Sequence, residues 1–361
     1  MVASNINVLV VDDSAFMRNA LSRMITETPG MSVAGKGRNG KEAIEQVRGL
    51  KPDLLTLDIE MPEMDGLTAL RLIRQFSDIP VLMVSSLTAE GSLASLKALR
   101  YGASDVLAKD HSMVSANINS LRDDLITKIT ALVATKREGA SQPIQNRIAP
   151  NQAPADHLPA VSSFELIVIG ASTGAPPELE RIAKAIPDDL DVPIVIAQHM
   201  PAVFTASLAD RLDNLSTYRC IEATHGGLLE PRTIAIAPGG MHTRIANQHG
   251  SLVMRVSDQP SDLIYKPSVD ELFKSASQAS GSKTLGIVLT GMGNDGCEGA
   301  KAIHSAGGKV VTQDANSCVV YGMPKAVDEA GCSAAQMTPD EIASYLSTHC
   351  QSIEPIMKSI I

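Results

Sequence analysis

The sequence predicts an α/β protein with two domains, each built on a mainly parallel sheet. Its 361 residues are more than one domain usually holds. Short apolar segments alternate with segments of helical periodicity in both halves of the chain. Between the halves, residues 138–163 are rich in proline and small polar residues, which is typical of a linker. We therefore expect domains at 1–137 and 164–361, with a packed connector as the alternative for 138–163.

The first domain should contain five strand–helix repeats. Its first helical segment, for example, places Met17, Leu21 and Met24 on one face. Repeats of this length predict an open parallel sheet with helices on both faces. The apolar segments expected to form its strands are Asn7–Val11, Met31–Ala34, Leu54–Leu57, Val81–Val84 and Asp105–Ala108.

The second domain repeats this alternation and should be a doubly wound, mostly parallel α/β domain. A helix is expected at Pro176–Ile186, because its apolar residues fall on one face and prolines suit a first helical turn. The segments expected to form strands are Glu165–Ile169, Val192–Ala197, Thr233–Ala237, Leu285–Thr290 and Lys309–Thr312.

Charge and composition argue against several classes of protein. The formal net charge of −9 argues against nucleic acid as a partner, because a phosphate backbone selects basic surfaces. The five cysteines match no CxxC or zinc-binding spacing and are expected to be reduced thiols. The first residues lack the basic region of a signal peptide, and no apolar segment approaches the length of a membrane span. We therefore expect a soluble, cytoplasmic protein without membrane insertion.

Polar side chains stand at the carboxyl ends of four strands of the first domain. Asp12 and Asp13 follow the first strand, and Asp58 follows the third. These ends meet at one edge of a parallel sheet, and clustered carboxylates there favour Mg²⁺ and phosphoryl transfer. Ser85 and Lys109 end the fourth and fifth strands and could bind phosphoryl oxygens. Each residue alone could be an ordinary loop residue, but the combination at matching strand ends favours the site.

Four segments carry these residues: VVDDS at 10–14, LDIEMPEMDG at 57–66, VSS at 84–86 and AK at 108–109. Together they resemble the response-regulator receiver domain, which has a flavodoxin-like (βα)5 fold. The resemblance implies that a histidine kinase phosphorylates Asp58 and that Asp12, Asp13, Asp58 and the carbonyl of Glu60 hold the metal ion. It also implies that Ser85 moves onto the phosphoryl group and that Lys109 pairs with it.

Two positions depart from the receiver pattern. Lys109 is followed by Asp110 where the family usually has proline, and Val106 stands where the family often has an aromatic switch residue. Neither change removes the phosphorylation chemistry. Both leave open whether the switch moves as it does in relatives.

Ser172 is a candidate nucleophile in the second domain. It lies in the segment LIVIGASTGAPPELERI, between a strand and the start of a helix. Free backbone amides at a helix N-terminus can bind an anion, including an acyl-transfer oxyanion. Nucleotide binding is the alternative, but GASTGA lacks the GxGxxG spacing, and the next strand is followed by Gln198-His199 instead of an acidic residue.

His199 and Asp295 could complete a catalytic triad with Ser172. Taken alone, His199 could be structural and Asp295 could cap the following helix. Adjacent parallel strands, however, would bring Ser172 and His199 to one sheet edge, with Asp295 available to orient the imidazole. The chain order differs from that of α/β-hydrolases. Amides of the turn at Thr173 and near Met292 and Gly293 could stabilise the oxyanion.

Six motifs stand in order in the second domain: IGASTGA, AQHMP, IAPGGMH, KPSVDELF, LTGMGNDG and SCVVYGMPKAV. As an ordered set they closely resemble the catalytic domain of chemotaxis protein-glutamate methylesterases, with Ala175 in place of the second glycine of the usual pair. The resemblance implies that Ser172, His199 and Asp295 hydrolyse glutamate γ-methyl esters on methyl-accepting chemotaxis receptors, releasing methanol, with no cofactor in the esterase site. It also implies that the unphosphorylated receiver covers the esterase cleft, and some members of the family deamidate receptor glutamine as well.

Two other functional classes remain as alternatives. The output domain could recognise a receptor without catalysis, although the intact Ser, His and Asp positions argue against this. A DNA-binding regulator fits poorly with the acidic charge and with the lack of a helix-turn-helix pattern. Release of methanol from methylated receptors would separate the enzyme from the binding module.

Overall fold

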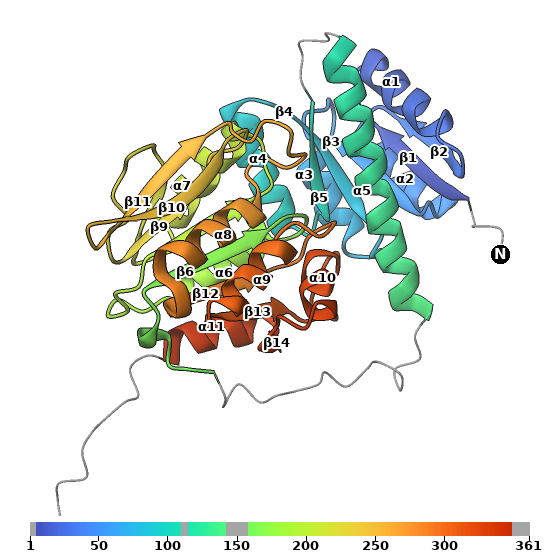
Figure 1. Cartoon of the computed structure of the whole chain (residues 1–361). Helices are drawn as coiled ribbons and strands as arrows, with labels where there is room; N and C mark the ends of the chain where they lie inside the picture. The colour runs from blue at the N-terminus through green and yellow to red at the C-terminus, as the bar shows by residue number, and fades with distance from the viewer. Residues whose placement is uncertain (1–4, 110–114, 142–157, 349–361) are drawn as a thin grey trace, which may run out of the picture.

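The computed structural model describes residues 5–109, 115–141 and 158–348. Both predicted α/β domains are present, and they lie side by side in Figure 1. The N-terminal domain is a five-stranded parallel sheet in the order β2-β1-β3-β4-β5. Its strands are β1 (Ile6–Val11), β2 (Met31–Gly37), β3 (Leu54–Asp58), β4 (Val81–Ser86) and β5 (Asp105–Lys109).

Alternating side chains of this sheet pack against helices on its two faces. Val8 and Val10 of β1 join the core cluster that includes α1 and α5, whereas Leu9 and Val11 join the cluster that includes α2 and α3. Side-chain caps fix the starts of four helices; Ser14, for example, accepts a hydrogen bond from the amide of Met17. The helices are α1 (Ala15–Thr26), α2 (Gly40–Leu50), α3 (Gly66–Ile73), α4 (Ala89–Arg100) and α5 (Ser115–Ser141).

The C-terminal domain contains a seven-stranded parallel sheet in the order β14-β13-β12-β6-β7-β9-β8. This confirms the predicted doubly wound fold, since one core cluster packs on α6, α7 and α11 and the other on α8, α9 and α10. The strands are β6 (Leu166–Ala171), β7 (Ile194–Gln198), β8 (Arg219–Glu222), β9 (Thr233–Ile236), β12 (Thr284–Val288), β13 (Lys309–Gln313) and β14 (Ala335–Met337). The helices are α6 (Pro176–Ala185), α7 (Ala202–Asp213), α8 (Val269–Ser280), α9 (Cys297–Ser305), α10 (Met323–Glu329) and α11 (Pro339–Ser347).

Several elements differ from the sequence-based expectations. An antiparallel hairpin of β10 (His242–Gln248) and β11 (Ser251–Ser257) was not predicted, because its polar residues obscure the apolar alternation. Helix α5 continues to Ser141, beyond the expected boundary at residue 137. A short 3-10 helix, η3 (Val161–Ser163), lies in the expected linker. The linker residues 142–157 lie outside the described part of the chain.

The two domains share an extensive contact. Helix α4 of the receiver-like domain packs against α6 and α7 of the C-terminal domain (Figure 1). The hydroxyls of Ser92 and Ser207 form a hydrogen bond across this contact, and Arg100 pairs with Glu180 at 3.5 Å. The contact also has an apolar part, since Met292 belongs to the same buried cluster as α5 residues.

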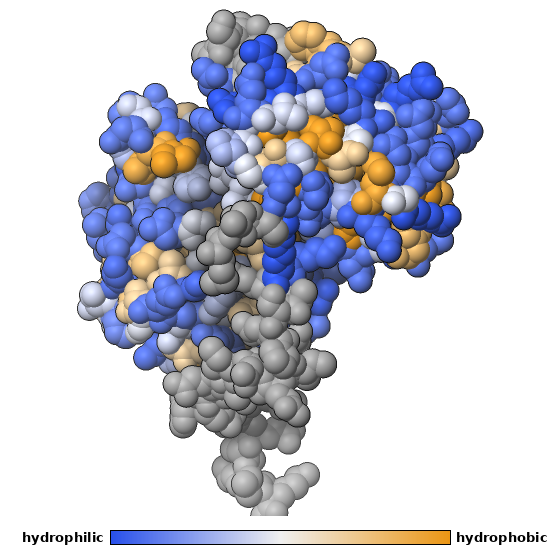
Figure 2. Space-filling model, turned by 90° about the vertical axis from the view of Figure 1, so that its right-hand side faces the viewer, coloured by the Kyte–Doolittle hydropathy of each residue, from blue (hydrophilic) through white to orange (hydrophobic). Residues whose placement is uncertain are grey.

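The surface that Figure 2 shows is mainly hydrophilic, with small hydrophobic areas near its centre. This agrees with the burial of most large apolar side chains in the four core clusters. Within the described residues, none of the helices combines the length and the hydropathy that crossing a bilayer would require.

Candidate active site

The three candidate catalytic side chains lie at the carboxyl ends of three neighbouring central strands. Ser172 directly follows β6, His199 directly follows β7, and Asp295 lies in the loop after β12. Because β6 stands between β12 and β7, the three loops meet at one edge of the sheet. The order of strands and helices predicted this convergence for Ser172 and His199, whereas the assignment of Asp295 rested on the resemblance to the esterase domain.

Hydrogen bonds connect the three side chains in a row. Nδ1 of His199 lies 3.2 Å from Oγ of Ser172, and Nε2 of His199 lies 2.9 Å from Oδ2 of Asp295. A neutral imidazole in this position can accept the serine proton at Nδ1 only if it carries its own proton on Nε2. The carboxylate of Asp295 favours that tautomer, because it accepts from Nε2. The arrangement can therefore activate a hydroxyl nucleophile.

Asp295 is held by the N-terminus of α8 as well as by His199. Its carboxylate accepts hydrogen bonds from the amides of Val269 at 2.7 Å and Asp270 at 2.9 Å, and from Oγ of Ser268 at 3.0 Å. Burial alone would raise the pKa of Asp295, but its hydrogen bond with His199 and these backbone amides lower the pKa overall. Asp295 thus contributes a fixed negative charge beside the imidazole.

Asp295 caps a helix, as the alternative prediction had it, but the helix is α8 and not α9, which follows Asp295 in the chain. Asp295 precedes α9, yet its carboxylate contacts the start of α8. Asp270 of α8 in turn accepts from the amides of Gly296 and Gly299 at 3.0 and 2.7 Å. The two aspartates therefore cap each other's helices, which fixes the loop that carries Asp295.

Two glycines allow the loops around Ser172 to come close together. A Cβ on Gly291 would lie 2.7 Å from Cβ of Ser172, which no side chain could tolerate. Gly174 has a φ of +83°, and a Cβ there would meet Val319 at 2.4 Å. The amide of Ser172 also donates to the carbonyl of Thr290 at 3.1 Å. These contacts place the serine at a sharp, fixed turn.

The role of Tyr265 was not predicted from the sequence, and neither was the connection of His242 and Ser268 with Asp295. The ring of Tyr265 stacks on His199, with 4.5 Å between centroids and 5° between planes. Buried His242 accepts from the amide of Ser268 at 3.2 Å, and burial lowers the pKa of its imidazole. Ser268 was recognisable as a cap from the SVDE pattern. Nothing in the sequence marks Tyr265, which lies in an irregular loop.

A cavity of about 400 Å³ opens beside Ser172, and both domains line it. Val106 and Ala108 of β5 face it from the receiver side. The catalytic side contributes Ser172, Thr173, His199, Met200, Tyr265 and Met292, among others. Thr173 and Met292, expected near the oxyanion, therefore lie at this cavity, and Gly293 follows in the same loop with a φ of +76°.

Asp105 of the receiver-like domain bonds directly to the residue after Ser172. Its Oδ2 accepts from Oγ1 of Thr173 at 2.6 Å and from Nζ of Lys128 at 2.5 Å. Burial would lower the pKa of Lys128, but the charges of Asp105 and Asp124 outweigh it and raise this pKa. The lysine is thus held as a cation at the wall of the cavity. The sequence did not indicate this contact, because its partners lie far apart in the chain.

The candidate phosphorylation site has the geometry that the sequence predicts for a cation site. Carboxylate oxygens of Asp12, Asp13 and Asp58 lie within 4.8 Å of one another. Nζ of Lys109 lies 2.7 Å from Oδ1 of Asp58. Burial, followed by the charge of Asp58, raises the pKa of Asp12 to about 6 against the opposing charge of Lys109. Burial also raises the pKa of Asp58.

These residues fit a hard divalent cation. The Oδ2 atoms of Asp12 and Asp58 are buried without a hydrogen-bond partner in the described structure, and such oxygens suit Mg²⁺. Glu60, whose carbonyl is the expected further ligand, follows Asp58 by two residues, and its side chain is exposed. Oγ of Ser85 donates to the carbonyl of Gly91 at 3.0 Å. Asp110, the other departure from the receiver pattern, lies outside the described residues.

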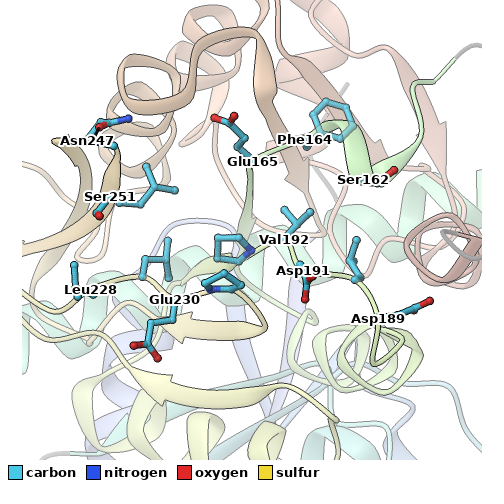
Figure 3. Close-up of a pocket in the computed structure, with 16 residues that line it drawn as sticks. Ser162, Phe164, Glu165, Asp189, Asp191, Val192, Leu228, Glu230, Asn247 and Ser251 are labelled. Carbon is cyan, nitrogen blue, oxygen red and sulfur yellow. Dashed lines mark hydrogen bonds between the residues drawn. The ribbon is translucent and has the colours of Figure 1, made fainter.

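A second cavity, of about 620 Å³, lies on the C-terminal domain away from the triad (Figure 3). It is lined by residues that precede β6 and β7, such as Glu165 and Val192, and therefore lies at the opposite ends of these strands. Glu230 and Asp191 add negative charge, and none of its lining residues is a histidine or cysteine. Unlike the cavity beside Ser172, it therefore has no imidazole in its lining.

Comparison with known proteins identifies relatives of both domains. The CheB methylesterase family matches residues 167–346, and the response regulator receiver domain matches residues 8–116. A protein-glutamate methylesterase/protein-glutamine glutaminase 1 of Oleidesulfovibrio alaskensis is 45% identical over 94% of this chain and 98% of its own length. A second such protein, from Nitratidesulfovibrio vulgaris, is 42% identical with the same coverage.

Among solved structures, the CheB methylesterase catalytic domain of Thermotoga maritima is similar to the C-terminal domain. It is 37% identical, covers 51% of this chain and 98% of its own, and has a TM-score of 0.50. The full-length relatives and both family matches agree with the fold and with the order of the two domains. The chain therefore belongs to the CheB methylesterase family, in the form that carries a receiver domain in front of the catalytic domain.

Proposed function

We propose that this protein is a phosphorylation-regulated serine hydrolase that demethylates glutamate γ-methyl esters on methyl-accepting chemotaxis receptors and releases methanol. The observation that carries this proposal is the hydrogen-bonded row of Ser172, His199 and Asp295, which faces a cavity large enough for a side chain. The names of the full-length relatives support both the esterase reaction and the deamidation of glutamine. We place this activity in the cytoplasm, as the sequence predicts.

The reaction would use the three residues in two steps. Oγ of Ser172 attacks the ester carbonyl while its proton passes to Nδ1 of His199. His199 then returns that proton to the departing methoxide, so methanol leaves and an acyl-enzyme remains. Water, deprotonated by His199, then attacks the acyl-enzyme; the acyl bond to Oγ of Ser172 breaks, His199 returns the proton to Oγ, and glutamate leaves. Asp295 stabilises the imidazolium in both steps.

The oxyanion of each tetrahedral intermediate would be bound by backbone amides. Those of Thr173, Met292 and Gly293 are the candidates, since they belong to the two loops that meet at Ser172. In the described structure, none of these three amides donates a backbone hydrogen bond. A glutamine side chain could follow the same route with ammonia as the leaving group, which would account for deamidation.

The direct test is methanol release from methylated receptor preparations. We expect wild-type protein to release methanol, faster after treatment with a phosphate donor. If the output domain only recognised receptors, binding would be detected without methanol. That result would favour the non-catalytic alternative.

Asp58 is the proposed phosphorylation site, with a histidine kinase as the donor. Asp12, Asp13, Asp58 and the carbonyl of Glu60 would hold Mg²⁺, which neutralises charge on a phosphoryl group during transfer. Lys109 would pair with the phosphoryl oxygens, and Ser85 would exchange its bond with Gly91 for one with the phosphoryl group. Val106 of β5 lines the esterase cavity, so a movement of β5 on phosphorylation would alter the cavity that Ser172 and His199 line.

We predict that the Asp58→Asn variant does not respond to a small phosphate donor. With Mg²⁺ and the donor, the wild type should gain activity of about 5- to 150-fold, the usual range for coupled sites. The variant should keep the unphosphorylated rate, because its triad is unchanged. Receptor demethylation measured with and without the donor checks this, and equal activation of both proteins would contradict the assignment.

We predict that the Asp105→Asn variant is more active than the wild type before phosphorylation. The substitution removes the charge that holds Thr173 and Lys128 at the domain contact, so the receiver should dock less tightly. The unphosphorylated rate should rise several-fold, toward that of the isolated fragment 164–361. Asp53→Asn is a matched control, because Asp53 pairs with Arg137 within the receiver. An unchanged rate in Asp105→Asn would show that this contact does not restrain the enzyme.

A further inference from the structure

Ile264 is the most exposed large hydrophobic side chain in the described residues. Its exposed fraction is 90%, whereas Phe16 follows with 63% and Leu228 with 57%. Single exposed hydrophobic residues are common on protein surfaces. Ile264 differs by its position, because it lines the cavity that Ser172 and His199 also line.

The loop that carries Ile264 is fixed by hydrogen bonds on both sides. Before it, the carbonyl of Pro260 accepts from Nε2 of buried His242 at 3.1 Å. After it, Nζ of Lys266 donates to the carbonyl of Asp258 at 3.2 Å. A side chain presented on a fixed loop loses less freedom when a partner binds, so it can contribute more to affinity.

Tyr265 connects this loop to the catalytic base. Its ring stacks on His199, and its hydroxyl lies near Gly293, where an added Cβ would be 3.4 Å away. Tyr265 is half-buried, while its neighbour Ile264 points to solvent. In this loop, Tyr265 therefore covers the imidazole of His199, and the preceding residue, Ile264, presents an apolar side chain to solvent.

The cavity can admit a substrate side chain but not a folded partner. Its volume of about 400 Å³ is near the lower end for ligand sites. A protein substrate must keep most of its surface outside, against the residues around the opening. Met200 and Pro201 also line the cavity, so Ile264 is not its only apolar lining residue.

We propose that Ile264 is a docking residue for the protein substrate and contacts an apolar side chain next to the esterified glutamate. This inference rests on the proposed esterase function and adds how the protein substrate is selected. Ile264 is exposed while the receiver lines the same cavity, so this contact is accessible before the receiver moves. The residue would affect the affinity for a protein substrate and leave the chemical steps unchanged.

The test compares two substrates with full-length protein activated by a phosphate donor and Mg²⁺. One is methylated receptor in membranes, and the other is a glutamate γ-methyl ester of dipeptide size. For Ile264→Ser we expect KM for the receptor to rise roughly ten- to a hundredfold, as loss of one buried isoleucine contact implies, with kcat unchanged. The small ester should be hydrolysed at the wild-type rate, and Ile264→Leu should restore receptor activity.

Leu228→Ser is the matched control, because Leu228 is an exposed leucine at the other cavity (Figure 3). This variant should hydrolyse both the methylated receptor and the small ester at the wild-type rate. The inference is overturned if Ile264→Ser keeps the wild-type KM for receptor, or if it lowers activity on both substrates equally. Loss of the proposed function would look different, since wild-type protein would then hydrolyse neither ester.

Discussion

Replacement of Ser172 by alanine should reduce turnover of the methyl ester on the order of 10⁶-fold, as found when a serine nucleophile is removed from a triad that acts as a unit. Without Oγ, His199 has no hydroxyl to deprotonate, and the remaining catalysis comes from binding and the oxyanion site. Within the described residues, the one hydrogen bond of this hydroxyl is with His199, so the fold should not depend on it. Methanol release by the phosphorylated protein is the measurement.

The Ser172→Ala variant should keep the wild-type thermal unfolding curve, because alanine retains the Cβ that packs near Gly291. Ser251→Ala is a suitable control, since Ser251 is an exposed serine at the other cavity (Figure 3). It should have wild-type activity. A Ser172→Ala protein that folds and still turns over within about tenfold of the wild type would exclude Ser172 as the nucleophile.

Asp295→Asn should reduce turnover by about 10⁴-fold, the loss seen when the acid of a comparable triad becomes an amide. An asparagine does not hold the proton on Nε2 of His199 and does not stabilise the imidazolium. Its amide group would also face the donor amides of Val269 and Asp270, where the carboxylate now accepts. Stability should therefore fall as well as turnover. The expected decrease in the free energy of unfolding is about 0.5–2 kcal/mol, the cost of a lost helix cap.

The pH dependence of unfolding gives a second measurement for this variant. The folded pKa of Asp295 is lowered, so its stabilising contribution is complete above the unfolded pKa of about 4 and is lost as the pH falls toward the lower folded value. Asp295→Asn should lack that part of the acid dependence. Asp270→Asn is the matched control, because Asp270 caps the neighbouring helix without touching His199. It should lose stability, and its turnover should fall far less than that of Asp295→Asn, because Asp295 keeps its own hydrogen bond to His199.

The sequence was sufficient to predict positions that depend on the order of strands. Asp12, Asp58 and Lys109 lie at the ends of parallel strands, and so do Ser172 and His199, because such ends meet at one sheet edge. The alternation of apolar segments and helices predicts that the strands are parallel, so their carboxyl ends face the same edge. Both folds were therefore correctly predicted, including the doubly wound character of the second domain.

Positions that depend on irregular loops or on distant contacts were not predictable. Asp295 precedes one helix and caps another, and only the packing of α8 beside α9 decides between them. Tyr265 lies in a loop without periodicity, yet it covers His199. Asp105 reaches Thr173 across the domain contact, and a pattern in one segment carries no information about such a partner.

Strand β5 has a consequence for how information would pass between the two sites. Lys109 at one end pairs with Asp58, and Asp105 at the other end holds Thr173. The two ends are separated by about 13 Å of rigid backbone at the usual rise of a strand. Thermodynamic linkage then acts in both directions: a receptor that displaces the receiver from the cavity should also stabilise the phosphorylated state of Asp58. Receptor occupancy would thus be an input to the phosphorylation signal as well as its target.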